Sequence, residues 1–231
     1  EVKAFVLEML DNLLSNHEID YIKWDFNRSV TEYYSLNLPA DRQKEFAHRF
    51  CLGFYDLLRC FEREIPDVII EGCAGGGGRF DAGALAYEPQ IWTSDNTDAQ
   101  DRTRIQYGTS LCYPLSTMDC HVAACPNHLV GRTTPFKTRC DVAYFGATGY
   151  ELDPRKLTEE EKRQVVERNA AYRRDENLIQ TGDLYRLLSP FEGNSFAQIV
   201  VAKDKSRAVA IVEFCLANVA GPYEDIVKID G

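Results

Sequence analysis

Apolar residues repeat at helical spacing at the start of the chain and predict a first helix over residues 2–14. Residues 19–25 follow as a short run with the composition of a buried strand. The same step then repeats, because aromatic and aliphatic positions predict a long helix over residues 46–61 that Pro66 ends, and residues 67–71 predict the next strand. This alternation of helix and strand is typical of an α/β fold.

The alternation continues through the middle of the chain. The pattern predicts strands at residues 90–93, 115–118 and 148–152, with a helix over residues 98–111. Thr158 and Glu161 form a capping box, which predicts that a further helix runs from there to about residue 174. Strands separated by helices of this length pair in parallel, either in an open doubly wound sheet or in part of a (β/α)8 barrel.

The polar residues at the strand ends favour the barrel. Asp25, Glu71 and Asp95 each lie at or just after the end of a different predicted strand, which is where barrel enzymes place reactive side chains. Near the C-terminus the pattern changes, since residues 196–202 and 207–214 flank a short polar turn and predict a β-hairpin. We therefore predict part of a (β/α)8 barrel followed by the start of an all-β domain.

Charge and composition disfavour several classes of function. Lysine and arginine number 26 against 36 aspartates and glutamates, and the net charge of −10 disfavours binding to a nucleic-acid backbone. No run of about eighteen apolar residues occurs, so we predict no membrane-spanning segment. The eight cysteines have no regular spacing, so we expect reduced thiols and a cytoplasmic location. Because the chain starts inside a helix without an initiator methionine, we expect it to be a piece of a longer protein.

The first candidate for chemistry is the end of the strand at residues 19–25. Side chains alternate along a strand, so Lys23 and Asp25 share one face while Trp24 lies on the other. A neighbouring ammonium group favours the ionised form of a carboxylate, which suits a nucleophile. A purely structural ion pair at the strand end explains the same pattern equally well.

The second candidate is the segment after residues 90–93, which holds Asp95, Asp98 and Asp101. Asp98 and Asp101 also fit the first turn of a helix, where acidic groups offset the macrodipole. Asp95 is nearest the strand end and is the best placed of the three to face a cavity. Two carboxylates on different barrel strands are what glycoside hydrolysis requires, one to attack the sugar or activate water and one to protonate the leaving oxygen.

Two further motifs, a run of glycines and a cluster of cysteine and histidine, are less specific for a function. Four glycines at residues 75–78 follow a strand but fit neither spacing of a phosphate cradle, so they form a flexible turn or a bare backbone that approaches a ligand hydroxyl. Cys120, Cys125 and His128 are of the types that bind zinc, but no second well-spaced pair accompanies them. We predict neither a metal site nor a cofactor.

Together these motifs resemble the successive signatures of glycoside hydrolase family 36, the bacterial-type α-galactosidases. The resemblance rests on residues 21–28, 73–81, 92–98, 126–128 and 149–153, which follow one another in the family's order over nearly the whole chain. Two residues depart from the family pattern. Ala74 stands where the family usually has serine, and Phe196 stands where tryptophan is common.

The resemblance implies a retaining hydrolase that acts on α-galactoside oligosaccharides such as melibiose and raffinose, needs no cofactor and assembles as a tetramer. Its central domain is a (β/α)8 barrel, of which residues 1–178 would hold strands four to eight. Residues 179–231 would then begin the C-terminal β domain. The family's earlier barrel strands supply a paired-aspartate motif and an arginine to the site, so we expect this chain alone to be inactive.

The resemblance also assigns roles that spacing leaves open. It implies that Asp25 is the nucleophile and that Asp95 is the general acid/base. By the same resemblance Lys23 and Asn27 contact the galactose ring, and Cys73 with the backbone of Gly76 lies at its 2-hydroxyl. These four residues and the two aspartates are the candidate site residues.

Three alternatives remain at this stage: galactosyl transfer to another sugar, hydrolysis of α-N-acetylgalactosaminides, and a carbohydrate-binding barrel that has lost catalysis. Cys73 and the glycine loop leave little room for an acetamido group, which favours galactose. Both candidate carboxylates are present, which disfavours a barrel without catalysis.

Overall fold

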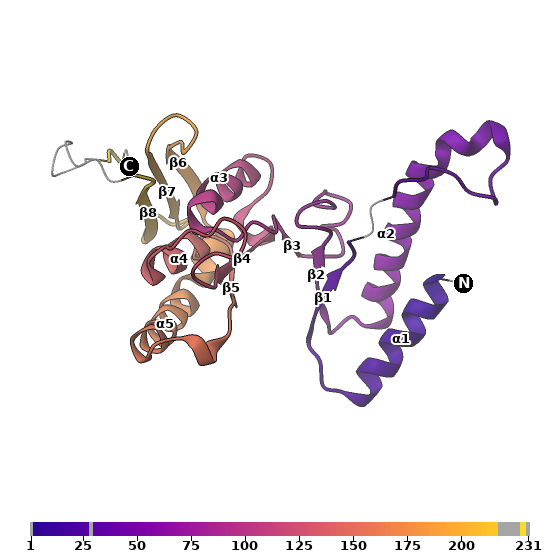
Figure 1. Ribbon diagram of the computed structural model, residues 1–231, viewed down its shortest axis with the longest axis horizontal. Coiled ribbons are helices and arrows are strands. Elements are labelled where there is room, and N and C mark those ends of the chain that lie inside the picture. The colour runs from indigo at the N-terminus through magenta and orange to yellow at the C-terminus, as the bar shows by residue number, and fades with distance from the viewer. Residues whose placement is uncertain (1, 28–29, 217–226, 230–231) are drawn as a thin grey trace. The chain divides into compact units, whose positions relative to one another are not determined.

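The computed structural model describes residues 2–27, 30–216 and 227–229 (Figure 1). Two compact units make up the chain, Glu1–Trp92 and Thr93–Gly231. Arg28 and residues 217–226, which belong to the predicted family motif and to the predicted β domain, lie outside the described residues.

The first unit combines helices with a parallel sheet (Figure 1). Its elements are α1 (Val2–Asn16), β1 (Tyr21–Asp25), a 3-10 helix (Ala40–Glu45), α2 (Phe46–Glu64), β2 (Ile69–Cys73) and β3 (Gln90–Trp92). Strand β2 pairs in parallel with β1 on one side and β3 on the other, and the register places Asp25 opposite Cys73. The predicted helix-strand alternation is confirmed here.

The core of this unit lies between α2 and the face of the strands that is turned toward α2. Phe54, Leu58 and Phe61 of α2 are buried there with Ile70 and Ile91 of the sheet. Alternate residues of β1, Ile22 and Trp24, pack against the same core. The intervening residues Lys23 and Asp25 therefore lie on the opposite face, as the period of two predicts.

The second unit continues the α/β pattern and ends in an antiparallel sheet (Figure 1). Its helices are α3 (Ala99–Ser110), α4 (Phe136–Ala143) and α5 (Glu159–Thr181), with short 3-10 turns at Leu115–Thr117 and Pro154–Lys156. Its strands are β4 (Met118–Ala123), β5 (Ala147–Glu151), β6 (Asp183–Leu188), β7 (Ser195–Val201) and β8 (Ala208–Phe214). Strands β4 and β5 are parallel, whereas β6, β7 and β8 form an antiparallel sheet in that order.

Several local predictions are confirmed in the second unit. The capping box at the start of α5 is complete, since Thr158 Oγ1 accepts from the Glu161 amide while the Glu161 carboxylate accepts from the Thr158 amide. The hairpin of β7 and β8 is present in the predicted place.

Other boundaries differ from the prediction. The strand predicted at residues 115–118 is wrong, because Pro114 starts a 3-10 turn there and β4 begins only at Met118. Strand β2 lies two residues later than predicted, since a turn closed by the Val68 amide and the Ile65 carbonyl occupies the expected start. Helix α4, only 8 residues long, was not predicted, and α5 runs on to Thr181.

The eight cysteines all fall among the described residues, and each is a free thiol. Over the same described ranges, none of the helices combines the length and the apolar character that a membrane crossing requires.

Candidate active site

The carboxylate of Asp25 ends β1 and is held from one side by Asn27. Asn27 Nδ2 donates to Asp25 Oδ2 at 2.9 Å, and Asn27 Oδ1 accepts from the Gly75 amide at 2.7 Å. One amide side chain therefore connects the strand-end carboxylate to the glycine loop after β2. Both side chains are exposed in this chain, so the carboxylate is accessible to a ligand.

The glycine loop turns sharply after β2. Gly75 and Gly76 have φ values of +59° and +79°, in the left-handed region that other residues rarely adopt. A Cβ on Gly75 would meet no atom within 4 Å, so the backbone conformation rather than space requires glycine there. The turn is closed by a hydrogen bond of 3.0 Å from the Ala74 amide to the Gly76 carbonyl. The loop thus presents bare backbone beside Asn27, as one of the two sequence interpretations expects.

Cys73 lies opposite Asp25 in the register of β1 and β2 and is buried. Burial raises the pKa of the Cys73 thiol to about 11, and its hydrogen bond to Asp25 adds to the rise, whereas a backbone hydrogen bond from Gly76 opposes it. The thiol is therefore neutral near pH 7. In that form it can contact a hydroxyl group but does not compete with Asp25 as a nucleophile.

Lys23 is oriented by the buried carboxylate of Glu71, a strand-end residue to which the sequence analysis assigned no role in the site. Its Nζ lies 2.6 Å from Oε1 of Glu71, whose other oxygen accepts from the Tyr21 hydroxyl at 2.6 Å. The same ammonium group lies 4.5 Å from the centroid of the Trp92 ring. Alternation along β2 puts Glu71 on the face of Cys73, and this was the available signal. The cross-strand pairing with Lys23 depends on a register that the sequence does not specify.

The first unit thus brings together five of the six predicted site residues at the carboxyl ends of β1 and β2: Lys23, Asp25, Asn27, Cys73 and Gly76.

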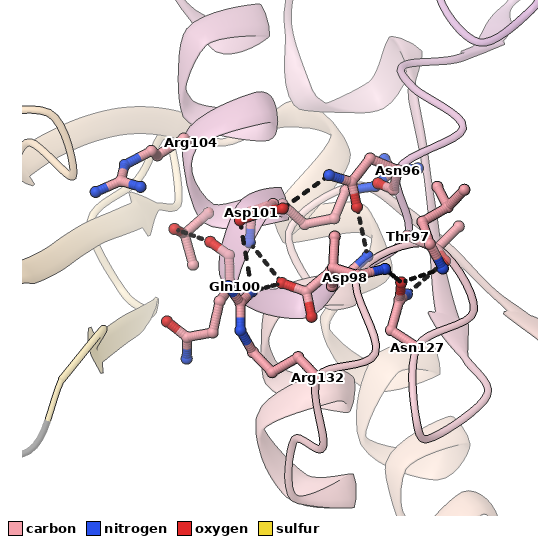
Figure 2. A network of polar contacts seen from close by, with 12 residues as sticks. Asn96, Thr97, Asp98, Gln100, Asp101, Arg104, Asn127 and Arg132 are labelled. Carbon is pink, nitrogen blue, oxygen red and sulfur yellow. Dashed lines mark hydrogen bonds and ion pairs between the residues drawn. The ribbon is translucent and has the colours of Figure 1, made fainter.

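The sixth predicted residue, Asp95, belongs to the second unit, in the segment that leads into α3. Its side chain is exposed, whereas Asp98 is only 1% exposed. Figure 2 shows the polar network around Asp98, in which its carboxylate accepts from the Asp101 amide at 3.0 Å and contacts Arg132. Asp98 is therefore the N-cap of α3 and Asp101 lies in its first turn. Of the three aspartates that spacing left open, Asp95 is the one without such a structural role.

Part of the metal-like motif is structural as well. Cys120 is buried in the middle of β4, and burial raises the pKa of its thiol to about 12. Within the part of the chain that the structure describes, no three histidine, cysteine, aspartate or glutamate side chains gather in a way that could hold a metal ion.

Comparison with known sequences places this site in a family. The profile of the melibiase family matches residues 1–182. The chain belongs to the melibiase family. The predicted membership of glycoside hydrolase family 36 is confirmed, because relatives named α-galactosidases match over essentially the whole chain.

Two curated relatives illustrate the match. It is 49% identical over 222 residues to α-galactosidase AgaA of Geobacillus stearothermophilus, covering 96% of this chain and 30% of that protein. It is 48% identical over 231 residues to α-galactosidase Mel36A of Lactobacillus acidophilus, covering 100% of this chain and 31% of that protein. The chain therefore spans about 30% of the length of these relatives.

Solved structures agree with the sequence match. The crystal structure of AgaA from Geobacillus stearothermophilus, a family 36 α-galactosidase, matches all of this chain and 32% of its own, with a TM-score of 0.95 at 48% identity. Variants of AgaA in complex with raffinose and with stachyose match equally well, with TM-scores of 0.95 at 47% identity. The predicted fold is confirmed as parallel α/β structure followed by an antiparallel sheet, and the numbering of the barrel strands stays a prediction.

Proposed function

We propose that the full-length protein is a retaining α-galactosidase in which Asp25 is the nucleophile and Asp95 the general acid/base. One observation carries the proposal. Asp25 lies at the end of a parallel strand and is joined through Asn27 to a glycine loop, with the neutral thiol of Cys73 directly opposite. Membership of the melibiase family supports the class of reaction.

The arrangement suits attack by Asp25 on an anomeric carbon. Asn27 donates to Asp25 Oδ2 and orients the carboxylate, whose exposed position lets it approach an anomeric carbon. Asp95 then protonates the departing glycosidic oxygen and later deprotonates the water that releases galactose, so that two displacements keep the α-configuration. No step requires a cofactor.

The remaining residues of the first unit bind the sugar in this proposal. Lys23, held by Glu71, donates to a ring hydroxyl without losing its orientation, and Asn27 can contact a second hydroxyl. Cys73 and the backbone of Gly76 lie at the 2-hydroxyl. Galactose rather than N-acetylgalactosamine is supported by the relatives that the chain matches, which are named α-galactosidases.

The substrates that we propose are α-galactosides such as melibiose and raffinose. This is supported by the relative AgaA, variants of which were crystallised with raffinose and stachyose. We further propose that the protein acts in the cytoplasm, which the eight free thiols support. We also propose a homotetramer, which the family resemblance implies.

The test is galactose release from raffinose by the full-length protein. We expect release by the wild type and a loss on the order of 10⁴-fold or more in Asp25→Asn, because removing a nucleophile abolishes the covalent step. Asp20→Asn, at the exposed opposite end of the same strand segment, is the matched control and should keep wild-type activity.

The alternatives give different products. A carbohydrate-binding barrel releases no galactose, and an α-N-acetylgalactosaminidase prefers the aryl α-N-acetylgalactosaminide to the aryl α-galactoside. A transferase yields oligosaccharides larger than raffinose in place of free galactose. Any of these outcomes contradicts the proposed activity.

A further inference from the structure

The buried guanidinium group of Arg102 hydrogen-bonds to the segment that carries Asp95. Arg102 lies on α3 and is only 2% exposed. Its Nε donates to the Asn96 carbonyl at 2.8 Å, and its Nη2 donates to the Ser94 carbonyl at 2.6 Å. Its Nη1 contacts the Thr93 hydroxyl. The two carbonyl groups belong to the residues immediately before and after Asp95.

This contact set uses the geometry of arginine. The planar fork presents several donors in fixed directions, whereas a lysine ammonium on a flexible stem cannot reach both carbonyl groups in the same orientation. Burial lowers the pKa of Arg102 from its ordinary value, and the negative charges around it, those of Asp119 and Asp95 among them, oppose that shift. The guanidinium group of Arg102 is therefore buried, and it donates to main-chain carbonyl groups instead of facing solvent.

The residues that follow Asp95 are held by further side-chain hydrogen bonds, which Figure 2 shows. The Asn96 side chain donates to Asp101 Oδ2 at 2.8 Å and accepts from the Asp98 amide at 3.1 Å. Asn127 Nδ2 donates to the Thr97 hydroxyl at 3.0 Å. The main chain on both sides of Asp95 is therefore anchored, while the Asp95 side chain itself is exposed.

We propose that Arg102 is a positioning residue that holds the Asp95 carboxyl in the orientation from which it protonates the leaving oxygen. The inference rests on the proposed role of Asp95 as general acid/base. Without the hydrogen bonds from Arg102, the main chain around Asp95 can move. A displacement of about 1 Å in a catalytic group can reduce the rate on the order of 10²-fold.

The experiment compares Arg102→Lys with the wild type in the full-length protein, on two substrates. Raffinose has a sugar leaving group that needs protonation, whereas p-nitrophenyl α-galactoside has an activated one that needs little. We expect kcat/KM to fall about 10- to 100-fold for raffinose and to stay within about 3-fold for the aryl substrate. Arg104→Lys is the matched control, since Arg104 is an exposed arginine of the same helix that bonds the Pro190 carbonyl at 3.1 Å.

A double-mutant cycle with Asp95→Ala separates positioning from a general loss of structure. If Arg102 acts through Asp95, adding Arg102→Lys to Asp95→Ala changes kcat/KM for raffinose by no more than about 2-fold. Losses that multiply in the double variant overturn the inference, and so do equal losses on both substrates.

Two further outcomes are decisive. If Asp95→Ala itself does not discriminate between the substrates, the proposed role of Asp95 fails; if it does and Arg102→Lys does not, only the inference on Arg102 is overturned. Should Arg102→Lys not fold, Thr93→Val is the alternative variant, because it removes the hydroxyl group that Arg102 Nη1 contacts. This variant is expected to lose about 3- to 10-fold on raffinose alone, and wild-type activity on raffinose would overturn the inference.

Discussion

Two glutamates of the first unit are buried in very different surroundings. Glu71 has the ammonium of Lys23 and the hydroxyl of Tyr21 as partners. Glu88 has a carboxyl oxygen that is buried without a hydrogen-bond partner, and its side chain packs so closely on β2 that a Cβ on Gly72 would lie 2.5 Å from it. The first environment accommodates a charge, and the second favours the neutral acid.

The state of Glu88 makes the stability of the protein depend on pH. Burial raises the pKa of Glu88 to about 7, the charge of Asp81 adds to the rise, and Arg79 opposes it. Because the unfolded chain ionises at lower pH, the folded form binds the proton more tightly, and stability falls as pH rises from about 4.5 to about 7. We expect Glu88→Gln to remove up to about 3 kcal/mol of this fall, measured from thermal unfolding of the full-length protein at pH 5 and pH 8.

The direction of the pH dependence of stability provides the control for Glu88→Gln. At pH 5 Glu88 is neutral in the folded protein, and only the first part of the fall in stability has taken place. Glu88→Gln should therefore unfold closer to the wild-type temperature at pH 5 than at pH 8, where it should unfold at a clearly higher temperature. Equal behaviour of the two proteins at both pH values contradicts the assignment.

Single residues also show how far the sequence can predict the site. Alternation along β1 correctly separates Lys23 and Asp25 from Trp24, because a period of two needs no tertiary information. The partners Glu71 for Lys23 and Arg132 for Asp98 were not predicted. Both depend on strand register or on the path of a loop far along the chain, which local pattern does not encode.

At the scale of elements, the N-terminus of α3 combines a cap with an ion pair. Asp98 accepts from the Asp101 amide and also contacts Arg132, so one side chain serves both interactions. The sequence predicted this helix start because aspartate is a favoured N-cap. It failed at Pro114, where a 3-10 turn replaces the expected strand start, since apolar residues alone do not distinguish the two.

Two substitutions separate the cap of α3 from its ion pair. Asp98→Ser retains an acceptor for the Asp101 amide but loses the contact with Arg132, whereas Asp98→Ala loses both. We expect the alanine variant to be less stable locally than the serine variant by about 1 kcal/mol. Hydrogen exchange of the first turn of α3 in the full-length protein measures the difference.

The cap of α5 provides the comparison. Thr158→Ala removes a capping box on a helix remote in sequence and should loosen the first turn of α5 by a similar amount, with α3 unchanged. Equal exchange of α3 in the serine and alanine variants of Asp98 would show that the cap contributes nothing there.

At the scale of the whole molecule, the proposed chemistry is divided between two parts of the chain. The first unit holds Asp25 with the residues that we propose to bind the sugar, and the second unit holds Asp95 in a segment hydrogen-bonded by Arg102. Helix-strand periodicity predicted the α/β class and the final hairpin, because both are repeated patterns. The barrel prediction rested on the polar residues at the strand ends and on the family resemblance, since open and closed parallel sheets share the same helix-strand periodicity.

The roles of the two aspartates are tested most directly by the configuration of the galactosyl azide that the full-length variants form. With an activated aryl α-galactoside, azide replaces the missing carboxylate of Asp25→Ala and attacks once, which gives the β-azide. In Asp95→Ala the galactosyl-enzyme still forms on Asp25, and azide then displaces it to give the α-azide. Proton NMR of the anomeric signal distinguishes the two products. The account predicts β from Asp25→Ala and α from Asp95→Ala, and an α-azide from Asp25→Ala would contradict it.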